Sequence, residues 1–287
     1  MTGLPGSIDE LQQRLADNAY LADRGLATGV FLALSLGQPL LVEGEAGVGK
    51  TELAKAMAAV LGVQLIRLQC YEGIDANQAL YDWDYARQLV YLRTLQEPGD
   101  AGDVFSERFL VERPLLAALR AGDRAVLLID EIDRADEEFE AFLLELLSDF
   151  QVTIPEIGPV RATRPPFVVL TSNRTRELHD ALRRRCLYHW IEYPELDREV
   201  EIVRARAPEI EASLAVDVST ATGRLRELDL VKRPGVAETI SWAKALGVLG
   251  RQLDASSAAD TIGVVIKDHD DVHVVTERLD WVVDGDG

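Results

Sequence analysis

The chain has 287 residues, 47% of them hydrophobic and 28% charged, so it can bury the core of one large domain or two ordinary ones and is not disordered. Its formal net charge of −19 disfavours non-specific attraction to nucleic acids or anionic membranes, which depends on basic surface, although it leaves a local basic channel open. No apolar run approaches the roughly 18 residues of a membrane span, the N-terminus does not match a signal peptide, and the distant Cys70 and Cys186 indicate a reduced, cytoplasmic setting.

Two helices are expected before the first strand. The first is predicted over Ser7–Asp23, because Ser7 with Glu10 three residues later forms a capping box. The second runs from about Gly25 to Leu36, where a glycine and a proline follow. The turn near residues 20–24 either packs as ordinary structure or lies against the base of a bound nucleotide, and the pattern favours neither.

The stretch from residue 44 to residue 51 fits the phosphate-binding pattern G-x-x-x-x-G-K-[ST]. A short apolar strand is predicted before it and a helix to Leu61 after it. This context places phosphates at a helix N-terminus, where the dipole favours anions, and makes a plain glycine turn the weaker interpretation. We expect Lys50 to meet the β- and γ-phosphates and Thr51 to ligate Mg²⁺. The residues expected to cradle the nucleotide are Gly44, Glu45, Ala46, Gly47, Val48, Gly49, Lys50 and Thr51.

A second strand is predicted over Val63–Tyr71, and a long connection follows it. Within the connection, Ala76–Thr94 is predicted to be mostly helical, Gln96–Asp103 to form a turn-rich break, and Pro114–Arg120 to form a helix with proline in its first turn. So long a connection indicates either an inserted element that touches a substrate or simply additional packing helices.

The apolar strand that begins at Ala125 ends in two carboxylates, Asp130 and Glu131. Phosphate-loop hydrolases need this arrangement, since the first acid holds Mg²⁺ through its water shell and the second polarises the attacking water. The alternative is that both acids simply end a strand at the surface. None of the three asparagines is followed by lysine, so the guanine-reading motif N-K-x-D is absent and adenine is favoured.

A helix capped by Asp136 is predicted to reach Asp149, and a β-hairpin over Gln151–Thr163 follows it. The next buried strand, Phe167–Thr171, leads to a polar tip that includes Asn173. A polar side chain there can hydrogen-bond both the attacking water and the γ-phosphate, provided that this strand lies beside the one that leads to the phosphate-binding loop.

Three adjacent arginines, Arg183, Arg184 and Arg185, follow a short helix and precede a fifth strand, Tyr188–Tyr193. They either form a solvated face or, in an oligomer, send one side chain to the γ-phosphate bound by a neighbouring subunit. The motifs upstream favour the second interpretation.

After Pro194 the chain is predicted to be helical, which divides it into an α/β nucleotide-binding domain over residues 1–194 and a smaller helical domain over residues 195–287. Arg233 and Pro234 are predicted to start a helix with proline at its first position. An arginine there either reports the γ-phosphate to the helical domain or is an ordinary exposed side chain. From Asp254 onward, acids outnumber bases nine to two, so this tail carries much of the negative charge.

Together these motifs resemble those of the AAA+ ATPases and, within them, the MoxR family. Gly44–Thr51 corresponds to Walker A, Leu127–Glu131 to Walker B and Asn173 to sensor 1. Two further stretches resemble the CoxD-like branch, which is linked to maturation of molybdenum-containing carbon monoxide dehydrogenase. They are Cys70–Gly73 and Asp130–Ala135.

The resemblance implies an α/β fold: an AAA+ P-loop NTPase core with a parallel five-stranded sheet in the order 5-1-4-3-2, followed by a helical lid. It implies that Arg185, or else Arg184, is the arginine finger and that Arg233 approximates sensor 2. It further implies ATP and Mg²⁺ as cofactors, a homo-oligomeric hexameric ring, a partner with a von Willebrand factor A domain, and a client metalloenzyme. The insert after the second strand and the hairpin would face the pore of the ring.

We therefore expect a cytoplasmic ATP hydrolase that remodels a protein and helps to load a metal cofactor into a client enzyme. Mg²⁺ would lie on Thr51 and Asp130, and Glu131, Asn173 and Arg185 would be the catalytic residues. Two alternatives remain. The acidic charge disfavours a nucleic-acid motor, and the complete catalytic set disfavours a nucleotide-dependent scaffold without hydrolysis.

Overall fold

The computed structural model describes residues 3–94 and 104–285. Contacts divide the chain into two compact units. The core unit comprises residues 1–14, 23–43 and 53–190, and the lid unit comprises residues 15–22, 44–52 and 191–287. The lid unit therefore takes in the phosphate-binding loop together with the C-terminal helices, and the domain boundary at residue 194 stays a prediction.

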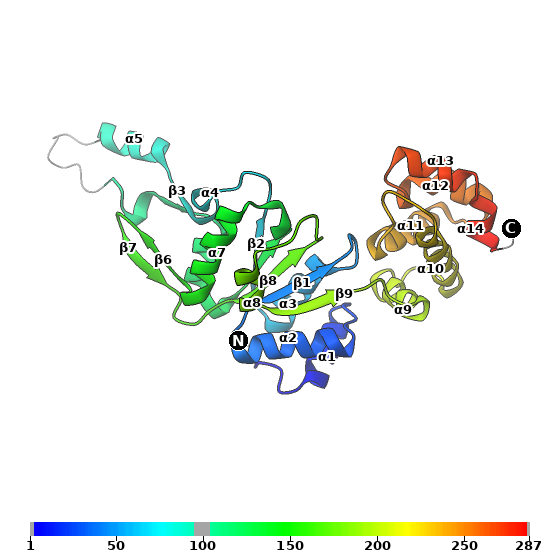
Figure 1. The fold of residues 1–287 in the computed structure, drawn as a ribbon, viewed down its shortest axis with the longest axis horizontal. Coiled ribbons are helices and arrows are strands. Elements are labelled where there is room, and N and C mark those ends of the chain that lie inside the picture. Colours follow the sequence, from blue (N-terminus) through cyan, green and yellow to red (C-terminus); the bar gives the residue numbers. More distant parts are fainter. Residues whose placement is uncertain (1–2, 95–103, 286–287) are drawn as a thin grey trace. The chain divides into compact units, whose positions relative to one another are not determined.

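A five-stranded sheet in the order β2-β5-β8-β1-β9 forms the centre of the α/β fold (Figure 1). Its strands are β1 (Leu40–Gly44), β2 (Gln64–Gln69), β5 (Ala125–Asp130), β8 (Phe167–Ser172) and β9 (Leu187–Ile191). The pairs β2–β5, β5–β8 and β8–β1 are parallel. Counted along the chain, this order is 5-1-4-3-2, so the predicted fold class is confirmed. Because parallel strands bring their carboxyl ends to one edge, the acids that end β5 and the tip of β8 lie at the edge from which the phosphate-binding loop departs.

The middle strands are buried throughout, which explains their continuous apolar sequences. Every residue of β1, β5 and β8 is buried, whereas the edge strand β2 has exposed and half-buried positions. A parallel sheet that is covered on both faces requires such runs, and this is why these strands are predictable from the sequence.

Helices pack on this sheet and share its hydrophobic core. The helix α6 contacts both β2 and β5, and the buried face of α7 joins the same cluster as Leu127 and Leu170. The helices from the N-terminus to β9 are α1 (Ile8–Asp17), α2 (Arg24–Leu36), α3 (Lys50–Leu61), α4 (Ala76–Leu80), α5 (Tyr85–Thr94), α6 (Pro114–Ala121), α7 (Glu137–Asp149) and α8 (Asp180–Arg185).

The first helix is shorter than predicted. It ends at Asp17 rather than Asp23, because Ala19 has a left-handed backbone (φ 55°) and the N–H of Tyr20 donates to the carbonyl of Leu15 at 3.0 Å. Ser7 does accept a hydrogen bond from the N–H of Glu10, at 3.1 Å. The Glu10 carboxylate, however, accepts from Gly6 rather than from Ser7.

The connection after β2 contains a strand that the sequence did not predict. Ala76–Thr94 is not one helix, because β3 (Tyr81–Trp83) separates α4 from α5 and pairs antiparallel with β4 (Leu110–Glu112). A three-residue strand whose partner lies far along the chain has no local periodicity to reveal it. The turn-rich break predicted at Gln96–Asp103 lies outside the described residues.

The helix and hairpin that follow β5 form as predicted. The carboxylate of Asp136 caps α7 by accepting the N–H of Phe139 at 2.8 Å. The strands β6 (Gln151–Ile154) and β7 (Gly158–Arg161) then pair antiparallel in a two-stranded sheet of their own.

The C-terminal part of the lid unit is helical. Its helices are α9 (Leu196–Arg206), α10 (Ala212–Glu227), α11 (Val236–Leu249), α12 (Ala255–Val265), α13 (His269–Thr276) and α14 (Leu279–Asp284). The buried Glu199 accepts two hydrogen bonds from Arg226, at 2.6 and 2.7 Å. The same guanidinium donates to the carbonyl of Pro234 at 2.8 Å and lies 4.5 Å from the centre of the Tyr193 ring. These contacts fix the loop that precedes α11.

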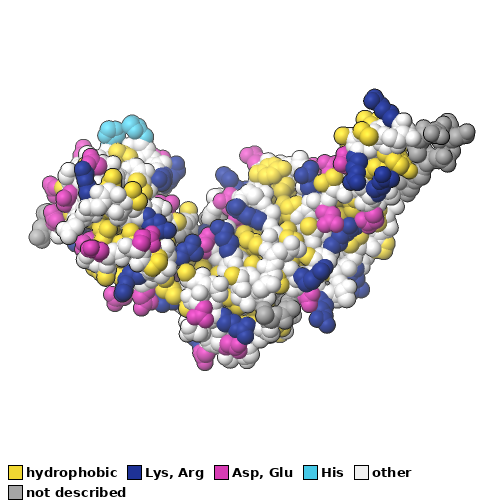
Figure 2. All heavy atoms as spheres, turned by 180° about the vertical axis from the view of Figure 1, so that it is seen from behind, with side chains coloured by type: hydrophobic (Ala, Val, Ile, Leu, Met, Phe, Trp, Pro, Cys, Tyr) yellow, Lys and Arg dark blue, Asp and Glu magenta, His cyan; other side chains and the backbone are white. Residues whose placement is uncertain are grey.

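Charges of both signs are interspersed with apolar atoms on the visible face of each unit (Figure 2).

Across residues 3–94 and 104–285, no helix combines the length and the apolar character that crossing a bilayer requires.

Candidate functional site

The phosphate-binding loop joins β1 to α3 and depends on glycine at its turns. Gly44, Gly47 and Gly49 have φ values of 155°, 75° and 98°, which side chains rarely permit. Space is also lacking, since a Cβ on Gly44 would lie 2.4 Å from the carbonyl oxygen of Ile191. The tight backbone of the loop therefore requires these residues.

Lys50 is the first residue of α3, and its ammonium lies inside the loop. The Nζ atom donates to the carbonyls of Gly44 and Glu45 at 2.7 and 2.6 Å, and the residue is only 7% exposed. A cation held against backbone carbonyls in a buried turn is suited to meet anionic oxygens there. Thr51 follows it in the first turn of α3 and is half-buried.

The start of α11 packs directly on the loop within the lid unit. A Cβ on Gly235 would lie 2.6 Å from both the carbonyl oxygen of Ala46 and the Cα of Gly47. The N–H of Ala237 donates to the carbonyl of Gly47 at 3.2 Å. Two glycines face each other here, and this allows the two backbones to approach so closely.

Arg233 does not start a helix, contrary to the prediction. Gly235 is the N-cap and its N–H donates to Glu238 at 3.0 Å, so α11 begins at Val236 and Pro234 lies outside it. Arg233 is exposed and lines a cavity of about 510 Å³ together with Glu45, Ala46 and Tyr193. Burial, with a further contribution from Glu45, raises the pKa of the Tyr193 hydroxyl, so this group stays protonated and can donate a hydrogen bond.

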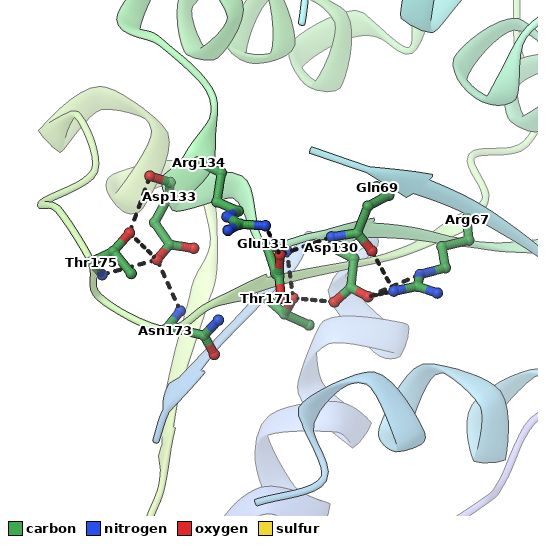
Figure 3. Close-up of polar contacts among 9 residues, drawn as sticks. All are labelled: Arg67, Gln69, Asp130, Glu131, Asp133, Arg134, Thr171, Asn173 and Thr175. Atoms are coloured by element: carbon green, nitrogen blue, oxygen red, sulfur yellow. Dashed lines mark hydrogen bonds and ion pairs between the residues drawn. The ribbon is translucent and has the colours of Figure 1, made fainter. Parts of the chain in front are cut away.

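In the core unit, Asp130 ends β5 and is only 2% exposed. One of its carboxylate oxygens accepts the hydroxyl of Thr171 at 2.5 Å. The other accepts Nε and Nη2 of Arg67, at 2.9 and 2.5 Å (Figure 3). The carboxylate is therefore fixed from both neighbouring strands, β8 and β2.

Glu131 begins the turn after β5 with a left-handed backbone, φ 54° and ψ 50°. Its carboxylate accepts Gln69 Nε2 at 2.9 Å and Arg134 Nη1 at 3.2 Å, and its N–H donates to the Thr171 hydroxyl at 2.9 Å. The Glu131 side chain is 33% exposed while that of Asp130 is 2% exposed, so the two adjacent acids have different surroundings. Of the two carboxylates, only that of Glu131 is therefore open to water.

Asp133 fixes the loop that carries Asn173. One of its oxygens accepts the N–H of Asn173 at 3.2 Å, and the N–H and hydroxyl of Thr175 at 2.9 and 2.7 Å (Figure 3). Its other oxygen is buried without a hydrogen-bond partner among the described residues. Asn173 itself is half-buried at the tip of β8.

The acids of this cluster also affect a neighbouring thiol. Burial raises the pKa of Cys70 to about 12, and the charges of Asp130, Asp133 and Glu131 add to the shift. The thiol is therefore neutral at physiological pH and carries no nucleophilic chemistry.

The three arginines lie within α8 rather than after it. Arg183 lies over the ring of Tyr188, 5.7 Å from its centre, whereas Arg184 and Arg185 are exposed at the end of the helix. Within the part of the chain that the structure describes, the Arg185 side chain makes no hydrogen bond or ion pair. The structure thus groups Asp130, Glu131 and Asn173 around β5 and β8, whereas among the described residues the three arginines make no hydrogen bond or ion pair with this group.

Four residues in this cluster were not identified as site residues from the sequence: Arg67, Gln69, Asp133 and Thr171. The strand order contained a signal for two of them. Since β2 was expected beside β5, alternate residues of β2 had to lie next to the acids that end β5. For Asp133 and Thr171 the sequence offered only their position beside a recognised motif.

Comparisons with known proteins place these features in a family context. Residues 39–186, just over half of the chain, match the family described as AAA domain (dynein-related subfamily). The chain is 26% identical to Protein NorQ of Paracoccus denitrificans over 86% of this chain and 87% of NorQ. It is 25% identical to the denitrification regulatory protein NirQ of Stutzerimonas stutzeri over 71% of this chain and 69% of NirQ. The solved structure of a point mutant of Thermotoga maritima RuvB is similar in fold, with a TM-score of 0.50 and 20% identity over 93% of this chain and 75% of RuvB.

Proposed function

The chain belongs to the AAA domain family, dynein-related subfamily, and from this membership we propose that it hydrolyses ATP to remodel another protein. The observation that carries the proposal is the pair of acids, Asp130 and Glu131, at the end of β5. In the sheet, a single strand, β8, separates β5 from β1, and β1 leads into the glycine loop. A glycine loop alone would bind a nucleotide, whereas adjacent acids at this edge supply what hydrolysis requires.

The residues of the loop and of the acid cluster fit ATP and Mg²⁺. The loop cannot accommodate a Cβ at Gly44, holds an ammonium at Lys50, and is followed by the hydroxyl of Thr51. Thr51 and the buried carboxylate of Asp130 would hold Mg²⁺. When bound, Mg²⁺ neutralises charge on the phosphate oxygens.

Each remaining residue has a role in this proposal. Glu131 accepts the proton of the attacking water, and Asn173 orients that water from the tip of β8. Arg185, or else Arg184, acts on the γ-phosphate bound by a neighbouring subunit of a ring. Arg233, beside Glu45 and Ala46 in the cavity of the lid unit, reports the γ-phosphate to the lid helices.

We further infer a MoxR-type role in a cytoplasmic ring, with a von Willebrand factor A domain partner and a client metalloenzyme. Similarity to NorQ and NirQ over most of the chain supports an accessory role, since the second is named a denitrification regulatory protein. The stretches Cys70–Gly73 and Asp130–Ala135 resemble the CoxD-like branch, which is linked to maturation of molybdenum-containing carbon monoxide dehydrogenase, and we propose a client of that kind.

A nucleic-acid motor is the second candidate, because the structurally similar RuvB is a Holliday junction branch migration motor. At 20% identity this similarity concerns the fold alone. The net charge of −19 and the mixed charges of the visible surface (Figure 2) favour a protein client instead.

Substitution of Glu131 tests the hydrolysis proposal. Glu131→Gln should retain ATP binding and lose at least about a hundredfold in kcat, because the amide cannot accept the proton. Glu145→Gln, at an exposed position on α7, is the matched control and should hydrolyse normally. Hydrolysis by Glu131→Gln at the rate of the unmodified protein would show that the role given to Glu131 is wrong.

Mixing of two inactive variants tests whether Arg185 of one subunit acts on the ATP bound by its neighbour. Arg185→Ala subunits retain the loop, and Lys50→Ala subunits retain the arginine, so each should be inactive alone and active when mixed. The solution mass with and without Mg·ATP shows whether a ring assembles. A monomer that hydrolyses nothing under any condition would contradict the self-assembling ring and direct the search to a partner protein.

A further inference from the structure

Arg67 of β2 binds the carboxylate that is proposed to hold Mg²⁺. Its Nε and Nη2 lie 2.9 and 2.5 Å from one oxygen of Asp130, and the Thr171 hydroxyl occupies the other oxygen at 2.5 Å (Figure 3). The Asp130 carboxylate therefore forms an ion pair with an arginine of the same chain.

Strand register explains why this partner is Arg67. Gln69 lies directly opposite Asp130 in the parallel pair β2–β5, and Arg67 lies opposite Leu128, two residues earlier. Residues two apart on a strand share a face, so both β2 side chains extend over the acids. Arg67 also donates to the Gln69 side chain, which in turn holds Glu131 at 2.9 Å. One row of β2 side chains thus contacts both acids.

The two members of the ion pair differ in their freedom to move. The Arg67 side chain is 49% exposed on an edge strand, whereas that of Asp130 is 2% exposed and held by Thr171. Arg67 can turn into water at little cost, but Asp130 cannot leave its position. The ion pair of Arg226 and Glu199 provides the contrast, since both side chains are nearly buried, at 11% and 2%, and neither can leave.

We propose that Arg67 competes with Mg²⁺ for Asp130 and so raises the Mg²⁺ concentration at which the nucleotide site loads, an inference that rests on the proposed function. A guanidinium and Mg²⁺ are both cations that would draw on the charge of the same carboxylate, and like charges repel each other. Arg67 acts here as a positioning residue that balances the Asp130 charge until the metal replaces it.

The test measures binding rather than turnover. The probe is a fluorescent, non-hydrolysable ATP analogue, titrated with Mg²⁺ at fixed protein concentration. Arg67→Gln should lower the Mg²⁺ concentration for half-maximal binding by about fivefold, the scale expected for a half-exposed charge. Arg67→Lys keeps the charge with fewer donors and should lower it by no more than about twofold. Arg113→Gln is the matched control, because Arg113 is as exposed as Arg67 (46% against 49%) and pairs with the exposed Asp82, so the Mg²⁺ dependence should stay unchanged.

Each outcome has a distinct meaning. An unchanged or higher Mg²⁺ requirement in Arg67→Gln would overturn this inference and leave the proposed function intact. Unmodified protein that binds no analogue at any Mg²⁺ concentration would overturn the proposed function itself. Thermal melting establishes whether each variant folds, and if Arg67→Gln does not, Arg67→Met supplies the charge removal with a side chain of similar length.

Discussion

The phosphate-binding loop and the acid cluster are built by opposite means. The loop is one continuous stretch whose turns require glycine backbones. A Cβ would also be crowded at Gly44, at Gly47 and at Gly235, where α11 meets the loop. The acid cluster draws side chains from β2, from the end of β5 and the turn after it, and from β8, and holds them with hydrogen bonds. Substitutions that add side-chain atoms at these glycines should therefore abolish the function of the loop. Substitutions that remove hydrogen-bond partners from the acid cluster should weaken its function gradually.

Gly235→Ala should cause the largest effect. The added Cβ would lie 2.6 Å from the Ala46 carbonyl oxygen and from the Gly47 Cα, so the loop or the start of α11 must shift. We expect nucleotide affinity to fall by at least about a hundredfold, because the phosphates depend on exact loop geometry. Equilibrium binding of an ATP analogue measures it.

Gly223→Ala is the matched control for this change. Gly223 lies within α10, and a Cβ added there would meet no atom within 4 Å, so alanine should stabilise the lid helix by about 0.5–1 kcal/mol and leave affinity unchanged. Equal binding by the two variants would contradict the requirement for glycine where α11 meets the loop.

Asp133→Ala should have the next largest effect. It removes the acceptor of three hydrogen bonds from Asn173 and Thr175 in a buried position, so the free energy of unfolding should fall by about 3 kcal/mol and kcat by about tenfold. Urea unfolding and steady-state hydrolysis measure the two effects. Asp123→Ala removes only the ion pair with the exposed Arg164 and should change stability by less than about 1 kcal/mol. Equal losses in both variants would mean that Asp133 has no special role.

Gln69→Leu should have a smaller effect that is confined to hydrolysis. The change removes the hydrogen bond to the Glu131 carboxylate, which Arg134 still contacts, and the bond from Arg67, which keeps its two bonds to Asp130. We therefore expect kcat to fall by about fivefold without a change in KM. Gln64→Leu, at the exposed start of β2, is the control. A raised KM would show that Gln69 acts on binding rather than on Glu131.

The smallest expected effect concerns Cys70, whose thiol should hardly react and should not influence hydrolysis. Its pKa is raised to about 12, so in the folded protein the thiol stays protonated below that pH. At pH 8 iodoacetamide should react with it on the order of a thousandfold more slowly than with the unfolded chain. Hydrolysis should show no step near pH 9, where a free thiol would ionise. Rapid alkylation of Cys70 in the folded protein, measured by mass spectrometry, would contradict this prediction.

The sequence predicted the sheet well because its strands are continuous apolar runs bounded by recognised motifs. Leu40–Gly44, Ala125–Asp130 and Phe167–Ser172 could be identified without knowledge of any neighbour. The same holds for the caps at Asp136 and Gly37, which are local signals.

Two of the errors share a physical cause, which is that a residue distant in the chain decided the outcome, whereas the early end of α1 has a local cause at Ala19. The strand Tyr81–Trp83 exists because Leu110–Glu112 pairs with it, and α11 begins at Val236 because Gly235 is the cap beside Gly47. In the candidate site, the motifs identified the acids but not Arg67, which reaches Asp130 through the pairing of two strands. Local sequence motifs identify the reactive groups, whereas the pairing of distant strands determines which residues contact them.

The facing glycines, Gly47 and Gly235, also limit how this chain can diverge. When two bulky side chains meet, enlargement of one can be compensated by reduction of the other, and a sequence can drift through such paired changes. Here both positions already hold the smallest residue, and a Cβ on either would meet the backbone of the other. No substitution at one can rescue a change at the other, so mutagenesis libraries that vary both positions should return glycine at each.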